Sequence, residues 1–323
     1  MNPKTLSAIS LDAIKSIFHD AVRTSLDLFK IMIPIIIGVK IFKELGLIEY
    51  LALPLSPLME LCGLPAQTGL VWAAAIANTL YSAIIVYLAL IPDMPTLTVA
   101  QVTVMCVMML IAHNLPVETQ ITKKCGINPW GQAFIRFFGA LACGMLLNLV
   151  FSHGGLLTEP SRAAFTAEAR ELGIGEWAFK EVRQLGWIFC IILALLTLMR
   201  VLRFLRITNL LIFMLGPILR LLGIGREAGT LTIIGLTMGI GYGGGLIIHE
   251  AKSGRLRQRD IFASLTLMGL SHALIEDSLL MLLLGASLQG VLWGRLLFSL
   301  AVTALLSRLY ILWESRVKSP DQA

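Results

Sequence analysis

The sequence has few charged residues. Asp, Glu, Lys and Arg make up 14% of the 323 residues, 57% are hydrophobic, and the mean hydropathy is +0.82. Soluble domains have about 25% charged residues, and a soluble core of this length could not bury so much apolar surface. We therefore expect an all-α polytopic membrane protein. Six apolar stretches approach or reach the roughly 20 residues that span hydrocarbon: 69–91, 98–112, 132–151, 186–202, 261–275 and 291–312.

Other absences exclude further classes. The five cysteines have no CxxC spacing, which excludes a metal knuckle and argues against a disulfide framework. Residues 1–22 lack the apolar core and cleavage site of a secretory signal. The glycine-rich stretch 237–250 lacks the Gly-Lys-Ser/Thr ending of a phosphate loop, and no nucleophile–base pair or cofactor motif is present. We expect neither an enzyme nor a cofactor, and we assign the net charge of +6 to cytoplasmic loops rather than to nucleic-acid binding.

The chain contains an internal repeat. Residues 55–69, LSPLMELCGLPAQTG, align with 215–229, LGPILRLLGIGREAG, at an offset of 160. Residues 113–118, HNLPVE, then align with 272–277, HALIED, at an offset of 159, so that a histidine and a carboxylate coincide. Chance would match Leu and Ala freely, but not His, Pro, Arg and Gly in register. We interpret the chain as a duplication.

The distribution of basic residues predicts that the two halves have opposite orientations. The turn 92–98 has no basic residue, whereas its counterpart 252–260 has four. Basic loops are retained in the cytoplasm, so the first turn is expected outside and the second inside. This is an inverted repeat, as in many secondary transporters. Both basic termini are expected in the cytoplasm, and the protein in a bacterial inner membrane.

Each repeat is expected to contain spanning helices, a re-entrant helical hairpin (about 50–91 and 208–251) and a broken helix. Gating or structural roles fall on Pro57, Pro116, Pro217, Gly241, Gly243 and Gly244. The expected parts are a cytoplasmic segment 1–22, a first repeat 23–152, an outer polar connector with amphipathic helices 153–185, a second, inverted repeat 186–313 and a cytoplasmic tail 314–323.

Polar residues gather where the helices are expected to break. Pro116 lacks a backbone donor and disfavours helix at the residue before it, and broken backbone at membrane depth must be buried in protein or line a cavity. Predicted contacts for a solute or a coupling ion are His113, Asn114, Glu118, His272, Glu276, Asp277, Asn78, Tyr81, Ser82 and Tyr242. Three interpretations stay open: solute binding, coupling to a proton or a sodium ion, and ion pairs at a wet interface. The glycines of 237–250 either pack helices closely or unwind one hairpin arm.

The motifs PLSPLMELCGLP (54–65), AHNLPVETQITKKCG (112–126), GPILRLLGIG (216–225) and SHALIEDS (271–278) carry a family resemblance. The chain resembles the nucleoside-recognition or gate domain family, which includes spore-maturation membrane proteins and the gate domains of bacterial ferrous-iron permeases and is related to concentrative nucleoside transporters. The resemblance implies that solute binds between the hairpin tips and the two broken helices. It places the family's polar positions at Asn114, Glu118, Glu276 and Asp277.

The leading functional hypothesis is a secondary active transporter of a small polar or anionic solute, with a nucleoside-like solute included. One alternative is a divalent metal-cation permease with ligands His113, Glu118, His272 and Asp277. Another is a non-transporting assembly factor of the spore-maturation type. The expected partners are a small-molecule solute and the lipid bilayer, and a homo-oligomer stays open.

Overall fold

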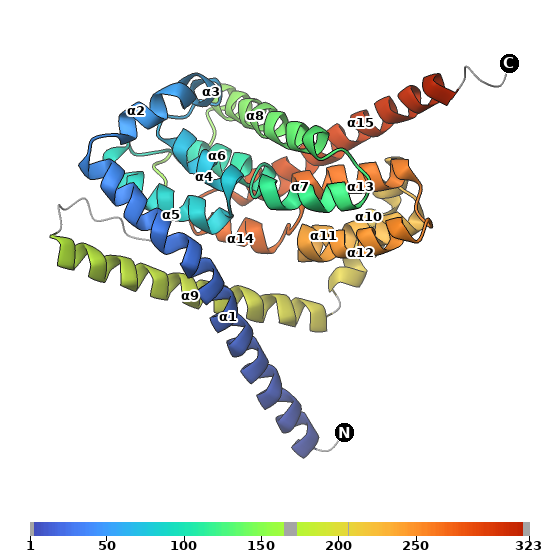
Figure 1. Cartoon of the computed structure of the whole chain (residues 1–323), viewed down its shortest axis with the longest axis horizontal. Helices are drawn as coiled ribbons and strands as arrows, with labels where there is room; N and C mark the ends of the chain where they lie inside the picture. Colours follow the sequence, from blue (N-terminus) through green and yellow to red (C-terminus); the bar gives the residue numbers. More distant parts are fainter. Residues whose placement is uncertain (1–2, 165–172, 206, 319–323) are drawn as a thin grey trace.

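The computed structural model describes residues 3–164, 173–205 and 207–318, apart from the side chains of 3–14, 203, 208–209, 241–242 and 317–318. Within these residues the chain is helical and has no β-strand (Figure 1). The first half consists of α1 (Pro3–Glu44), α2 (Ile48–Ala52), η1 (Leu53–Leu55), α3 (Ser56–Leu61), α4 (Thr68–Ala77), α5 (Leu80–Leu90), η2 (Ile91–Asp93), α6 (Val99–Ile111), α7 (Leu115–Lys124) and α8 (Pro129–Gly154). The second half consists of α9 (Ile174–Phe204), α10 (Ile207–Leu221), α11 (Arg226–Met238), α12 (Ile240–Lys252), α13 (Gln258–Ser271), α14 (Glu276–Leu282), the π-helical η3 (Gln289–Gly294) and α15 (Arg295–Lys318).

Five helical segments among the described residues are long and apolar enough to cross a membrane. They are Val99–Lys124, Pro129–Gly154, Ile174–Leu202, Gln258–Leu282 and Gln289–Arg316. The chain is thus a multi-pass membrane protein, as its composition predicts. Helix α1 is not among the five, because Asp27, Lys30 and Lys40 interrupt the apolar sequence of its C-terminal half.

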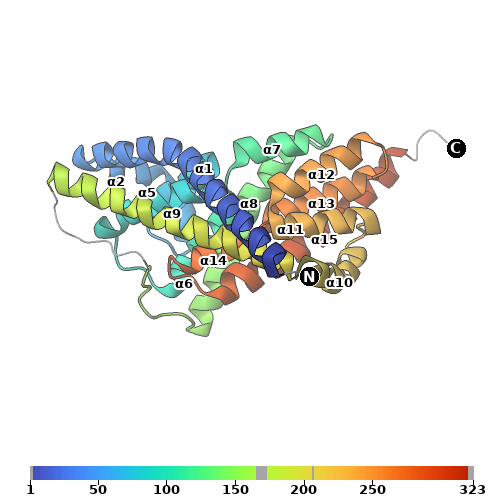
Figure 2. The same ribbon diagram turned by 90° about the horizontal axis from the view of Figure 1, so that it is seen from below.

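Helices α2–α5 gather at one end of the elongated molecule and α10–α13 at the other, with α7 and α8 between them (Figures 1 and 2). The long helices α1 and α9 cross along one side, where Met32 and Ile36 pack against Ile188 and Ile192. Helix α9 begins at Ile174, so the end of the predicted polar connector belongs to this helix instead of forming separate short ones. The middle of that connector, 165–172, lies outside the described residues.

Each half contains a helical hairpin. Helices α4 and α5 turn at Asn78–Thr79, and the Thr79 hydroxyl accepts a hydrogen bond from the backbone N–H of Ser82 at 3.4 Å. Helices α11 and α12 turn at Gly239, whose φ of +88° favours glycine. Gly243 of α12 packs so closely on α11 that a Cβ there would lie 2.8 Å from the Gly235 nitrogen. Close helix packing is one of the two roles expected for this glycine-rich stretch.

Two helices are broken near the middle of the molecule. The first break, residues 112–114, separates α6 from α7, and the second break, residues 272–275, separates α13 from α14. Asn114 and Ala273 adopt left-handed φ values of +51° and +47°, in a region that few residues other than glycine enter. Pro116 lies in the first turn of α7, whereas the second break forms without a proline.

Local geometry recurs at the spacing of the sequence repeat. The N–H of Leu64 donates to the carbonyl of Met59 at 2.9 Å, and the N–H of Ile224, 160 residues on, donates to the carbonyl of Leu219 at 3.0 Å. A positive-φ glycine lies in each of these turns and in the equivalent turns after α7 and α14, at Gly63, Gly223, Gly126 and Gly285. The prolines differ: Pro57 opens α3, but Pro217 lies inside α10.

Candidate functional site

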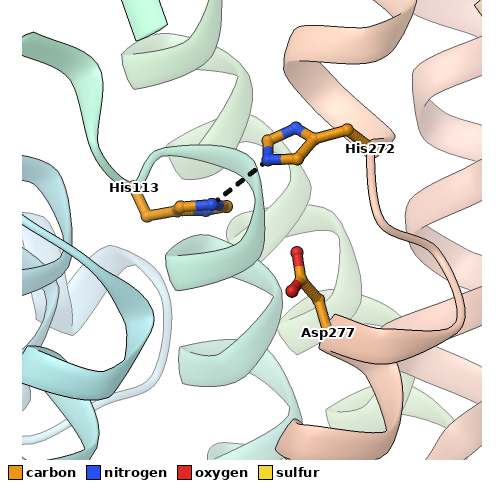
Figure 3. Close-up of side chains that lie close together, drawn as sticks. All are labelled: His113, His272 and Asp277. Carbon is orange, nitrogen blue, oxygen red and sulfur yellow. Dashed lines mark hydrogen bonds between the residues drawn. The ribbon is translucent and has the colours of Figure 1, made fainter. Parts of the chain in front are cut away.

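The two helix breaks meet at a pair of histidines. His113 comes from the first break and His272 from the second, and their Nε2 atoms lie 3.2 Å apart (Figure 3). Their exposed fractions are 7% and 3%. The contact joins residues 159 positions apart, so the fold brings together the two histidines that the sequence alignment pairs.

The opposite ring nitrogen of each histidine contacts a backbone carbonyl. His113 Nδ1 lies 3.1 Å from the carbonyl oxygen of Met109 and 3.2 Å from that of Leu110. His272 Nδ1 lies 2.8 Å from the carbonyl oxygen of Met268. A carbonyl can only accept, so each Nδ1 donates its proton. In a neutral imidazole the other nitrogen is then an acceptor, and the two Nε2 lone pairs face each other.

Glu118, on the first turn of α7, adds a third electron pair. Its Oε1 lies 3.5 Å from His113 Nε2 and 3.4 Å from His272 Nε2. Its Oε2 pairs with Arg136. The carboxylate is 5% exposed, so it is shielded from solvent and divides its two oxygens between an arginine and the histidine pair.

Asp277 completes the cluster on α14. Its carboxylate points toward the two rings (Figure 3), and one of its oxygens and one nitrogen of each histidine all lie within 4.8 Å of one another. Asp277 Oδ2 has no hydrogen-bond partner among the described residues. Glu276 lies next to it at the start of α14 and is half-buried.

A buried arginine holds the first break. Arg136 of α8 is 2% exposed, and it donates from Nε to the carbonyl of Ile111 and from Nη2 to that of His113, both at 2.8 Å. Its Nη1 pairs with Glu118. A cation at the C-terminal end of a helix satisfies carbonyls that lack an intrahelical partner and complements the helix dipole.

A second arginine repeats this contact at the second break. Arg295, the first residue of α15, is fully buried and donates from Nε to the carbonyl of Leu270 at 3.1 Å and from Nη2 to that of His272. Both arginines lie at the same sequence distance from their carbonyls, 25 and 23 residues. Sequence reasoning missed these carbonyl contacts, although the shared offset of 159 residues between the two arginines was a usable signal.

The hairpins dock on the breaks through backbone hydrogen bonds. The N–H of Asn114 donates to the carbonyl of Ala75 at the end of α4, and the N–H of Leu274 donates to that of Leu236 at the end of α11, both at 2.8 Å. Each break is therefore held between a hairpin and an arginine.

The remaining predicted site residues lie on the hairpins. Asn78 follows the last residue of α4, Ser82 is fully buried on α5, and Tyr81 is half-buried beside it. Tyr242 and Gly241 lie on α12, where the side-chain positions fall outside those described. Gly244 packs against Ile121 of α7, and Gly243 packs against α11. These contacts do not include the histidine pair.

A hydrogen bond that sequence reasoning missed also joins the halves. Gln132 of α8 donates to the hydroxyl of Thr266 on α13 at 2.9 Å, and both residues are buried. Neither residue is part of a recognisable motif, so the pair had no signal in the sequence.

The cluster has the chemistry of a cation-binding centre. It combines two imidazole nitrogens with two carboxylates. Of the two arginines nearby, Arg136 directs all three of its nitrogens to carbonyls and to Glu118, and Arg295 directs two of its three to carbonyls. Charges inside a membrane are costly unless they are paired, and such residues are usually functional.

Comparisons with known proteins agree with the membrane assignment. The chain is similar to the uncharacterized membrane protein YvoD of Bacillus subtilis (strain 168), with 23% identity over 295 residues that cover 90% of this chain and 93% of that protein. No family model and no solved structure matches.

Proposed function

We propose that this multi-pass membrane protein is a secondary active transporter of the bacterial inner membrane, and that the buried His113–His272 cluster is its translocation centre. One observation carries the proposal: two broken helices meet at ionisable side chains, and each break is hydrogen-bonded to a helical hairpin. Discontinuous helices that meet at a polar centre are characteristic of secondary transporters.

The recurring geometry supports an inverted duplication. The turns, the left-handed break residues and the arginine contacts recur at offsets of 159 or 160 residues. Together with the opposite charge of the turns 92–98 and 252–260, this supports halves that cross the membrane in opposite directions. The hairpins are then re-entrant gates, and both termini face the cytoplasm.

The cluster favours a cation over an anion as the solute or coupling ion. Three electron-pair donors converge between His113, His272 and Glu118, which attracts positive charge. An anionic solute would need free donors, and five of the six guanidinium nitrogens of Arg136 and Arg295 contact protein acceptors, while Arg295 Nη1 has no partner among the described residues. Of the hypotheses drawn from the sequence, these contacts favour the cation permease over the transporter of an anionic solute.

Transport is tested with the purified full chain in proteoliposomes. Solid-supported membrane electrophysiology records currents after concentration jumps of divalent metal chlorides, amino acids, nucleosides and organic anions. We expect a current with at least one solute, abolished by Glu118→Gln. The matched control is Glu49→Gln, because Glu49 is exposed on α2. No current with any solute from a correctly folded protein would instead favour an assembly factor.

Topology is tested by labelling single cysteines. Pro95→Cys and Arg255→Cys are made in a chain in which the exposed Cys190 is replaced by serine. An impermeant maleimide added to intact cells should label position 95, and position 255 only after the cells are opened. Labelling of both positions from one side would refute the inverted arrangement.

A further inference from the structure

We propose that His113, His272 and Glu118, with Asp277 as a fourth ligand, form a binding site for one divalent first-row transition metal ion. The proposal rests on the proposed function only where it names this ion as the transported solute. The site itself stands on the geometry of the cluster.

The three facing atoms form a nearly equilateral triangle. Its edges are 3.2 Å between the two Nε2 atoms, and 3.4 Å and 3.5 Å from these atoms to Glu118 Oε1. The centre of such a triangle lies about 1.9 Å from each corner. An ion slightly out of its plane reaches the roughly 2.0–2.2 Å at which zinc binds imidazole nitrogen and carboxylate oxygen.

The orientation of the rings fits metal ligands. Metal-binding histidines usually donate their second ring N–H to a carbonyl or a carboxylate, which fixes the tautomer and directs the free lone pair at the ion. His113 and His272 both make this contact with carbonyls of their own helices. The three facing lone pairs belong to the two Nε2 atoms and to Glu118 Oε1. A proton on one Nε2 would be shared between two of these atoms and leave the third lone pair without a partner. A metal ion at the centre accepts all three lone pairs.

The carboxylates fit the remaining ligand positions. Glu118 keeps Oε2 on Arg136, so Oε1 is free to bind an ion. Asp277 points toward the rings from the other half, and its Oδ2 has no partner within the described part of the chain. As a fourth ligand, Asp277 completes the tetrahedral coordination that zinc prefers.

The donor set selects the class of metal. Imidazole suits Zn²⁺, Fe²⁺ and their neighbours, whereas Mg²⁺ and Ca²⁺ prefer oxygen ligands alone. The proposed ligands include no thiolate or thioether, the donors that select Cu⁺. We therefore assign the site to ions such as Zn²⁺, Co²⁺, Fe²⁺ or Mn²⁺.

Binding is measured with the full chain in nanodiscs after washing with a chelator. Equilibrium dialysis against Zn²⁺ should give one tightly bound ion per chain. His113→Ala and His272→Ala should each weaken binding by about 100-fold or more. His153→Ala is the matched control, because His153 is exposed but makes the same ring contact, with Nδ1 3.0 Å from the carbonyl of Leu149. Equal affinity in the wild type and in both site variants would overturn the proposal.

A spectroscopic measurement on the wild type does not depend on whether the variants fold. X-ray absorption of the Zn²⁺-loaded protein should show two imidazole ligands at about 2.0–2.1 Å and at least one carboxylate oxygen. A coordination shell of oxygen alone would overturn the proposal. The nearly isosteric Glu118→Gln and Asp277→Asn should each weaken binding by about 10-fold or more, and the loss should be larger for Glu118, which completes the triangle.

A flux assay separates the site from the transport function. Proteoliposomes enclosing a metal-sensitive dye report Zn²⁺ entry. Binding at the histidines together with entry supports both proposals. Binding without entry supports the site and refutes metal transport. Transport of another solute by a protein whose histidines bind no metal overturns the metal site and leaves the transporter.

Discussion

The two breaks have the same kinds of backbone contact but differ in how their charged side chains are paired. Each has a histidine bonded to a carbonyl of its own helix, a left-handed residue after it and an arginine that donates to carbonyls. In the first break Glu118 pairs with Arg136. At the second break Asp277 Oδ2 and Arg295 Nη1 have no hydrogen-bond partner among the described residues. Aspartate is one methylene shorter than glutamate, so Asp277 does not form with Arg295 the ion pair that Glu118 forms with Arg136.

The difference suggests a division of roles between the halves. The first break holds its carboxylate in a fixed position, with one oxygen on an arginine and the other toward the histidines. The second break leaves its carboxylate available to a ligand. The same backbone arrangement therefore holds the carboxylate of Glu118 in place in the first half and leaves that of Asp277 free to bind a ligand in the second.

The largest expected difference concerns the two arginines. Arg136→Met leaves the buried carboxylate of Glu118 without its partner, which costs about 3–5 kcal/mol of unfolding free energy. Arg295→Met removes donors from two carbonyls but breaks no close ion pair, and should cost about 1–3 kcal/mol. Equilibrium unfolding in mixed micelles measures both, with the exposed Arg220→Met as control. Equal losses would show that the second arginine is as strongly coupled as the first.

A smaller effect is expected in double-mutant cycles. Arg136→Met combined with Glu118→Gln should destabilise the protein by about 1–3 kcal/mol less than the sum of the single changes, because the two side chains are directly paired. Arg295→Met combined with Asp277→Asn should show a clearly smaller coupling energy, because Asp277 Oδ2 and Arg295 Nη1 make no hydrogen bond among the described residues. The same unfolding assay, with chelator present, gives all values. A large coupling energy in the second cycle would remove the contrast between the halves.

The smallest effect concerns the left-handed residues. Ala273 adopts a φ of +47°, which disfavours a residue with a Cβ, so Ala273→Gly should stabilise the protein by about 1 kcal/mol. Asparagine tolerates this region better, and Asn114→Gly should change stability by a few tenths of a kcal/mol. Thermal unfolding in detergent compares the two variants with wild type. Stabilisation by Asn114→Gly alone would mean that the strain lies in the first break.

Much of this arrangement could be predicted from the sequence. Composition gave the membrane class, and Pro116 with its polar neighbours indicated the first break. The second break has no proline, and only its alignment with the first located it. The aligned histidines were recognisable as candidates because chance seldom repeats such residues in register.

Other features depend on packing that no local pattern reports. The contact between His113 and His272 spans 159 residues, so spacing rules for metal ligands could not find it. The sequence alignment makes Glu118 and Asp277 equivalent positions, and only the contacts of each side chain in the fold separate them. Helix α9 begins inside the predicted polar connector, at Ile174, and its Trp177 packs into the cluster between α1 and α9.

The arginine contacts bear on how the chain is assembled during synthesis. Each arginine finds its carbonyls no more than 25 residues earlier in the chain. A nascent half therefore contains the partners of its own buried cation as it enters the bilayer, where an isolated arginine would hinder insertion. The histidine pair needs both halves, so it cannot form before synthesis has reached His272. The first half can therefore enclose Arg136 before any partner for His113 exists, and the centre is assembled only as the second half follows it.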